Sequence, residues 1–313
     1  MRRWVRPRAV PRGGTVGIIS PSGPVEAEAL ERGITAIKGM GFDIRLGRHV
    51  LDKRGYLAGD DTSRAADLNQ MFRDPGIDAV VCSRGGYGAT RILDLIDYEA
   101  VRSSRKVFVG FSDITALHIA IHRRARLVTF HGAVAHAGSE QAVSDYNNSS
   151  LLRVITSREP AGELHNPPGE PPPVGAHGGR SLGRLVGGNL SLITASIGTP
   201  YEIDTRGAIL AVEEVTERPY RLDRMLRQLK LAGKLDGVAG IVLGEFVRCE
   251  ADPEKPSLSR EEVLEEYFGG LGVPVVSGLR FGHGAYRLTL PLGVMAEIDG
   301  DCGSLAIVEP AVA

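Results

Sequence analysis

Cysteine is scarce in this chain of 313 residues, which has only Cys82, Cys249 and Cys302. Three widely separated cysteines match neither a disulfide framework nor a paired metal-binding motif, so we expect small buried residues in a reducing compartment. An excess of charge of one sign is also missing, because the formal net charge is −1. A chain with so small a net charge has no strong electrostatic potential that would attract nucleic acid or an anionic membrane, and we expect a small-molecule partner instead.

Long apolar runs are absent as well. No window of the sequence approaches the roughly 18 apolar residues that a membrane-spanning helix needs. The amino terminus, MRRWVRPRAVPRGG, is basic but lacks the apolar core of a secretory signal. We therefore expect a protein that stays in the cytoplasm.

The length and the apolar pattern predict two α/β domains. A chain of 313 residues is about twice the usual domain size, and its first half alternates short apolar runs with helical patterns, which indicates a mostly parallel sheet. We expect an N-terminal α/β domain over residues 1–150 and a second domain over residues 183–313. Between them, residues 151–182 include the stretch NPPGEPPP, which predicts a partly extended linker, with a long surface loop as the alternative.

Ser112 stands between the apolar run Lys106–Phe111 and the helical pattern Asp113–Arg123. A serine at such a junction exposes its hydroxyl at the edge of the sheet, beside the free amides of a helix N-terminus, as in a nucleophile elbow. The G-x-S-x-G pattern is incomplete, because Ile114 takes the place of the last glycine. A plain helix N-cap would explain this serine equally well.

A glycine-rich segment, Ser83-Arg84-Gly85-Gly86-Tyr87-Gly88, also follows a predicted buried strand. Consecutive glycines let the backbone approach a ligand and direct its amides at an anion, which favours an oxyanion-hole loop. A phosphate cradle and a purely structural turn are the alternatives. The segment matches neither the P-loop nor the dinucleotide-binding fingerprint, so a nucleotide site has weak support.

A carboxylate and an imidazole in the second half are candidates for acid–base chemistry. Glu213 directly follows the apolar strand Ala208–Val212, with Glu214 and Glu217 as competitors and a solvated strand end as the alternative. His283 lies between two glycines and is a candidate base. Neither H-E-x-x-H nor H-x-x-E-H spacing occurs, so we expect no metal site. Other histidines remain available as bases: His118, His122, His131 and His136.

Taken together, these segments resemble the LD-carboxypeptidase family, which also includes the microcin-immunity peptidases. The resemblance extends from about Gly14 to Glu309, nearly the whole chain. It rests on seven segments in family order: Gly17–Gly23, Arg84–Gly88, Val109–Thr115, Gly187–Leu190, Ile209–Val215, Pro219–Leu226 and Gly278–His283.

The resemblance implies the roles of individual residues. The family's nucleophile falls on Ser112, its acidic residue on Glu213 and its base on His283, and the amides of Gly86 and Asp113 correspond to the oxyanion donors. It further implies a flavodoxin-like first domain, a smaller β-rich α/β second domain, a homodimer and no cofactor. The family's L-E-D segment reads Val-Glu-Glu here, so a glutamate replaces the usual aspartate after Glu213.

The implied activity is hydrolysis of the bond between an L-diamino acid and the terminal D-Ala of murein tetrapeptides, in cytoplasmic peptidoglycan recycling. A terminal carboxylate needs a cationic pocket, for which Arg84 and Arg221 are candidates, with Tyr87 as a further substrate contact. One alternative is a microcin-immunity type peptidase acting on peptidyl or aminoacyl nucleotides, although the sole tryptophan, Trp4, lies in the N-terminal tail. A nucleotide- or sugar-binding module without catalysis is the other.

Overall fold

The computed structural model describes residues 3–135 and 141–313 of the chain, which form two compact units. The first unit comprises the chain up to Pro160 together with Arg287–Gly293 and Pro310–Ala313, and the second comprises Ala161–Tyr286 and Val294–Glu309. Each unit contains one sheet with helices packed on it, so the predicted two-domain α/β class is confirmed.

The sheet of the first unit has the strand order β12-β5-β4-β3-β1-β2. Neighbours from β2 to β5 are parallel, and the order 2-1-3-4-5 is that of flavodoxin-like folds, as predicted. Short apolar sequences form these strands, and β3 and β4 are buried throughout, as expected for a parallel sheet covered on both faces. The bounds are β1 Thr15–Ile19, β2 Asp43–Leu46, β3 Ala79–Cys82, β4 Val107–Gly110, β5 Thr129–His131 and β12 Leu290–Leu292.

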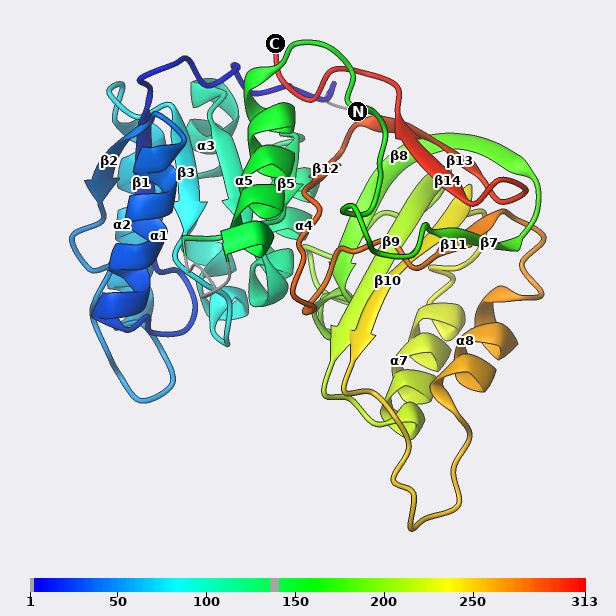
Figure 1. Cartoon of the computed structure of the whole chain (residues 1–313). Helices are drawn as coiled ribbons and strands as arrows, with labels where there is room; N and C mark the ends of the chain where they lie inside the picture. The colour runs from blue at the N-terminus through cyan, green and yellow to red at the C-terminus, as the bar shows by residue number, and fades with distance from the viewer. Residues whose placement is uncertain (1–2, 136–140) are drawn as a thin grey trace. The chain divides into compact units, whose positions relative to one another are not determined.

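Helices lie on both faces of this sheet (Figure 1). Helix α1 packs beside α5, whereas α2 packs beside α3 and α3 beside α4. The apolar residues of α1 recur at helical spacing, so that Leu30, Ile34 and Ile37 are all buried. The bounds are α1 Ala27–Gly39, α2 Asp61–Arg73, the 3₁₀ turn η1 Ala89–Leu95, α3 Tyr98–Ser104, the 3₁₀ turn η2 Ser112–Ile114, α4 Thr115–Arg124 and α5 Gln141–Thr156.

The second unit has an eight-stranded sheet with the order β6-β14-β13-β8-β9-β10-β11-β7. The central strands β8 to β11 are parallel, and the outer strands pair antiparallel. Its strands are β6 Gly162–Glu163, β7 Val174–His177, β8 Arg180–Asn189, β9 Ala208–Val215, β10 Gly240–Val247, β11 Val275–Ser277, β13 Met295–Asp299 and β14 Ser304–Ile307. Its helices are α6 Leu190–Ala195, α7 Pro219–Leu231 and α8 Arg260–Phe268.

Residues 151–182 are more structured than the predicted linker. Helix α5 continues to Thr156 because Leu151 and Val154 are buried, and β6, β7 and the start of β8 also lie in this range. The longest part without helix or strand is the proline-rich segment, residues 164–173, and Asn166 holds it by a 2.7 Å bond from Nδ2 to the Pro171 carbonyl. The chain passes from the first unit to the second after Pro160, whereas the domain boundaries at residues 150 and 183 stay a prediction.

Across residues 3–135 and 141–313, none of the helices combines the length and the apolar character that crossing a membrane would require.

Candidate active site

Ser112 is the first residue of η2 and occupies the sharp turn between β4 and α4 in the first unit. Its φ is +62°, in the left-handed region that residues with a side chain seldom adopt. The turn leads directly into α4, and Gly110 lets it close, because a β-carbon at that position would stand 2.7 Å from Cβ of Ile114. The N-cap position of the turn is Phe111, so Ser112 is not a plain N-cap. Strand, strained serine and helix follow one another as in a nucleophile elbow.

The glycine-rich segment after β3 passes directly over this turn. A β-carbon at Gly85 would lie 2.8 Å from Cβ of Ser112, 2.9 Å from the Phe111 carbonyl oxygen and 3.2 Å from the Asp113 amide nitrogen. Gly86 has φ +116° and is exposed. Only a residue without a side chain fits at the first position, so the backbone of this segment and the Asp113 amide are neighbours.

Hydrogen bonds join the loops after β1 and β3. The hydroxyls of Ser20 and Ser83 are 2.7 Å apart, and the amide of Gly23 donates to the Gly85 carbonyl at 3.2 Å. The fully buried guanidinium of Arg64 donates to the carbonyls of Pro21 and Gly88, which belong to the two loops. The sequence alone does not single out Arg64, because a buried arginine on an amphipathic helix has no local signal.

The side chain of Asp113 is buried beneath the turn. Its Oδ2 accepts hydrogen bonds from the Ser22 hydroxyl at 2.5 Å and from the Ala89 amide at 2.8 Å. Burial raises the pKa of Asp113, and the hydrogen bond from Ser22 opposes that rise. This carboxylate therefore connects the turn at Ser112 to the loops after β1 and β3.

Glu213 and His283 lie together in the second unit. Glu213 is fully buried in β9, and its Oε2 is 2.7 Å from Nδ1 of His283, which follows β11. With a proton on Nδ1 donated to the carboxylate, Nε2 of a neutral imidazole carries the lone pair that can accept a proton. Gly282 has φ +138°, and a β-carbon there would lie 3.3 Å from Cβ of Glu213, so the loop approaches β9 closely.

The competing glutamates have other partners. Glu214 is buried on the next position of β9, and its carboxylate accepts from the Ser191 amide at 2.7 Å and from Asn189 Nδ2 at 2.9 Å, at the start of α6. Burial raises its pKa. Glu217 pairs with Arg221, Oε2 to Nη1, at 3.2 Å. Of the three, Glu213 is the one bonded to His283.

The predicted substrate contacts fall in different units. Arg84 and Tyr87 flank Gly85 and Gly86 in the first unit, and both are exposed. Arg84 Nη1 donates to the Pro24 carbonyl at 3.3 Å. Arg221 lies in the first turn of α7 in the second unit and already pairs with Glu217.

The alternative bases are buried in the first unit. His118 lies with Nε2 3.2 Å from the Gly110 carbonyl oxygen, and His122 with Nε2 2.9 Å from Thr129 Oγ1. His131 is fully buried as well, and His136 lies outside the described residues. In the described ranges no group of His, Cys, Asp and Glu side chains is arranged to hold a metal ion.

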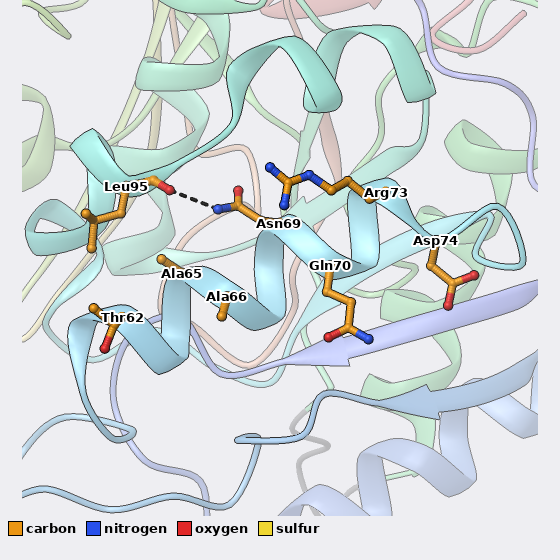
Figure 2. Close-up of a pocket in the computed structure, with 8 residues that line it drawn as sticks. All are labelled: Thr62, Ala65, Ala66, Asn69, Gln70, Arg73, Asp74 and Leu95. Carbon is orange, nitrogen blue, oxygen red and sulfur yellow. Dashed lines mark hydrogen bonds between the residues drawn. The ribbon is translucent and has the colours of Figure 1, made fainter.

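One pocket of the first unit lies along α2 (Figure 2). None of the predicted catalytic or substrate-contacting residues lines it, and the drawn hydrogen bond joins Asn69 Nδ2 to the Leu95 carbonyl. Its lining consists of Thr62, Ala65, Ala66, Asn69, Gln70, Arg73, Asp74 and Leu95.

Two family models match the chain, one in each half. The model of the LD-carboxypeptidase N-terminal domain matches residues 16–132, and that of the LD-carboxypeptidase C-terminal domain matches residues 182–298. The first match includes the turn at Ser112, and the second includes Glu213 and His283.

Individual relatives cover nearly the whole chain. A protein of Bacillus subtilis named a probable murein peptide carboxypeptidase is 40% identical over 98% of this chain and 95% of its own length. The murein tetrapeptide carboxypeptidase of Pseudomonas aeruginosa is 34% identical over 93% of this chain and 95% of its own. Among solved structures, the microcin C7 self-immunity protein MccF in complex with aspartyl sulfamoyl adenosine is 27% identical, with a TM-score of 0.90 over 99% of this chain and 100% of that one.

Proposed function

Because the chain belongs to the LD-carboxypeptidase family, we propose that it is a serine carboxypeptidase that removes the terminal D-Ala from murein tetrapeptides. The scissile bond would join the L-centre of a diamino acid to D-Ala, and the reaction would serve peptidoglycan recycling in the cytoplasm. The observation that carries the proposal is the 2.7 Å bond between Glu213 and His283, in a chain whose Ser112 has φ +62°.

The proposed mechanism uses Ser112 as nucleophile and His283 as base. Oγ of Ser112 attacks the carbonyl carbon of the diamino acid while Nε2 of His283 accepts its proton. Glu213 holds the imidazole by Nδ1 and stabilises the imidazolium that forms. The amides of Gly86 and Asp113 donate to the oxyanion of the tetrahedral intermediate.

Collapse of that intermediate expels the amine of D-Ala, which takes the proton from His283, and leaves an ester on Ser112. Water then attacks the ester while His283 accepts its proton, and His283 returns this proton to Oγ of Ser112 as the shortened peptide leaves. We propose that Arg84, within the glycine-rich segment, binds the carboxylate of D-Ala, with Tyr87 and Arg221 as further contacts.

The test is release of D-Ala from a purified murein tetrapeptide. We expect Ser112→Ala to abolish release, whereas Ser104→Ala, at the end of α3, should leave it unchanged. Loss of one oxyanion donor typically costs about 10²–10³ in turnover, so loss of the nucleophile should cost more. Unchanged release by the Ser112 variant would remove this residue from its assigned role.

A second candidate function is hydrolysis of peptidyl or aminoacyl nucleotides, favoured by the similarity to MccF in its complex with an aminoacyl sulfamoyl nucleoside. The sole tryptophan does not support a stacked nucleobase, because the Trp4 ring packs edge-on against His122 at 5.0 Å. Comparing kcat/KM for a murein tetrapeptide and an aminoacyl sulfamoyl nucleoside separates the two activities. A protein that cleaves neither and resists a serine-directed fluorophosphonate would be a non-catalytic binding module.

We also propose that the protein acts as a homodimer. Light scattering after size exclusion, over a range of protein concentrations, would give the mass directly. A mass of one chain at every concentration would contradict the dimer without affecting the proposed chemistry.

A further inference from the structure

A second glutamate lies directly beneath the loop that carries His283. Glu245 interrupts the apolar strand β10, and its side chain is only 13% exposed. A β-carbon at Gly284 would lie 2.5 Å from Oε2 of Glu245, and one at Gly282 would lie 3.2 Å from its Cβ. Both neighbours of His283 therefore rest on this one side chain.

Arg280 connects Glu245 to the proline-rich segment. Its Nη1 is 3.4 Å from Oε1 of Glu245, and its Nη2 is 2.6 Å from Oε2 of Glu170. The same segment also holds the backbone of the loop, because the Arg280 amide donates to Asn166 Oδ1 at 2.8 Å and Asn166 Nδ2 donates to the Gly278 carbonyl at 2.9 Å. The loop from Gly278 to Gly284 is thus attached on one side to β10 and on the other to residues 166–170.

The charges in this cluster depend on one another. Burial raises the pKa of Glu245, Arg280 opposes that rise, and the nearby charges of Glu170 and Glu213 add to it. Oε2 of Glu245 is buried and has no hydrogen-bond partner among the described residues. Burying a carboxylate costs free energy unless a cation pairs with it. The ion pair with Arg280 therefore offsets part of the cost of burying Glu245 next to the Glu213–His283 pair.

We propose that Glu245 and Arg280 are positioning residues that fix the His283 loop, so that the imidazole stays on Glu213. The part that concerns turnover rests on the proposed function, whereas the part that concerns the loop does not. Neither side chain is assigned a contact with substrate. Their effect would act through the geometry of His283, where a misplacement of about 1 Å can cost 10²-fold in rate.

The test compares Glu245→Gln, Arg280→Lys and Arg280→Met with a matched control, Glu309→Gln. Glu309 is also half-buried, accepts from Arg184 at 2.9 Å and from the Met295 amide at 2.9 Å, and lies in the same unit. Two quantities are measured: hydrogen–deuterium exchange of peptides covering residues 278–286, and kcat and KM for a murein tetrapeptide.

We expect exchange in the loop to accelerate at least about tenfold in Glu245→Gln and Arg280→Met, and kcat to fall by about 10–100-fold with KM within about twofold. Arg280→Lys keeps a charge but cannot reach both carboxylates with a planar fork, so its effect should be intermediate. Glu309→Gln should change neither quantity. If Glu245 and Arg280 only stabilised the fold, their substitution would leave both the hydrogen–deuterium exchange of this loop and kcat unchanged.

The double variant Glu245→Gln/Arg280→Met provides a second criterion. Removing Arg280 alone leaves a buried carboxylate without its counter-charge, and removing both should therefore restore part of the lost kcat and of the lost protection. Additive losses, or unchanged loop exchange in every variant, would overturn the proposal. If the wild-type protein releases no D-Ala, the proposed function fails, and the exchange data still decide whether this pair holds the loop.

Discussion

Gly85 lies so close to Ser112 that its position has no room for a side chain. In Gly85→Ala the new β-carbon would stand 2.8 Å from Cβ of Ser112 and 2.9 Å from the Phe111 carbonyl oxygen, so one of the two backbones must move. We expect kcat to fall by about 100-fold, because a displacement of about 1 Å at the nucleophile has an effect of that size. Steady-state kinetics on a murein tetrapeptide measures it.

Gly39→Ala is the matched control for this substitution. Gly39 ends α1, and a β-carbon there would have no neighbour within 4 Å. We expect unchanged kinetics and a gain of about 0.5–1 kcal/mol in the free energy of unfolding, since alanine favours a helix over glycine. Equal kinetics in the two variants would mean that the glycine-rich segment does not constrain Ser112.

At single positions, the sequence indicates which residues are candidates for the site better than it indicates their backbone conformations. The junction of an apolar strand and a helix was enough to single out Ser112, but its φ of +62° depends on how Gly85 and Gly110 let the chain pack. Glu245 has the same sequence signal as Glu213, a carboxylate within an apolar strand, so the local sequence does not tell the two apart. What distinguishes the two is their place relative to His283, which follows from strand order and not from local sequence.

At the scale of elements, β9 directs two adjacent glutamates to different partners. Glu213 forms a hydrogen bond with His283. The carboxylate of Glu214 instead accepts hydrogen bonds from the amide and hydroxyl of Ser191, from the side chain of Asn189 and from the Val215 amide, so it provides the acceptors for the polar groups at the start of α6. In Glu214→Gln the amide group cannot accept all of these bonds, and at least one buried donor loses its partner.

We expect Glu214→Gln to lower the free energy of unfolding by about 1–3 kcal/mol, the usual cost of a buried group left unsatisfied. Glu217→Gln, which removes an exposed pair with Arg221, should change it by no more than about 0.5 kcal/mol. Urea unfolding followed by circular dichroism compares them. Equal stability of the two variants would show that Glu214 does not hold α6.

Most elements of the two sheets follow from apolar periodicity, but not their pairing. The neighbouring apolar strands β12 and β13 belong to different sheets, because β12 pairs with β5 in the first unit and β13 with β8 in the second (Figure 1). A run of apolar residues fixes neither its sheet nor its neighbour, and Pro291 fits only because β12 is an edge strand. The proline-rich residues 166–173 form neither helix nor strand, whereas α5, β6, β7 and β8 extend into other parts of residues 151–182.

At the scale of the whole molecule, acid should weaken the first unit through its buried histidines. Burial lowers the pKa of His118 to about 4 and that of His122 well below its ordinary value. The unfolded chain takes up these protons near pH 6.5 and the folded chain does not, so stability present above that pH is lost as the pH falls towards 4. For His118 alone the loss should approach about 3 kcal/mol.

Four carboxylates with raised pKa values act in the opposite direction, because the folded protein protonates Asp67, Asp113, Glu214 and Glu245 before the unfolded chain does. The histidine contribution is therefore isolated by comparing wild type with His118→Leu, which cannot titrate at that position, and with His165→Gln, which alters an exposed histidine. The sole tryptophan, Trp4, lies in the first unit against His122, so its fluorescence reports the unfolding of that unit in urea. Between pH 7 and 5 the free energy of unfolding of the wild type and of His165→Gln should fall in parallel, and that of His118→Leu should fall distinctly less. The same dependence on pH in all three proteins would mean that His118 does not remain neutral in the folded protein.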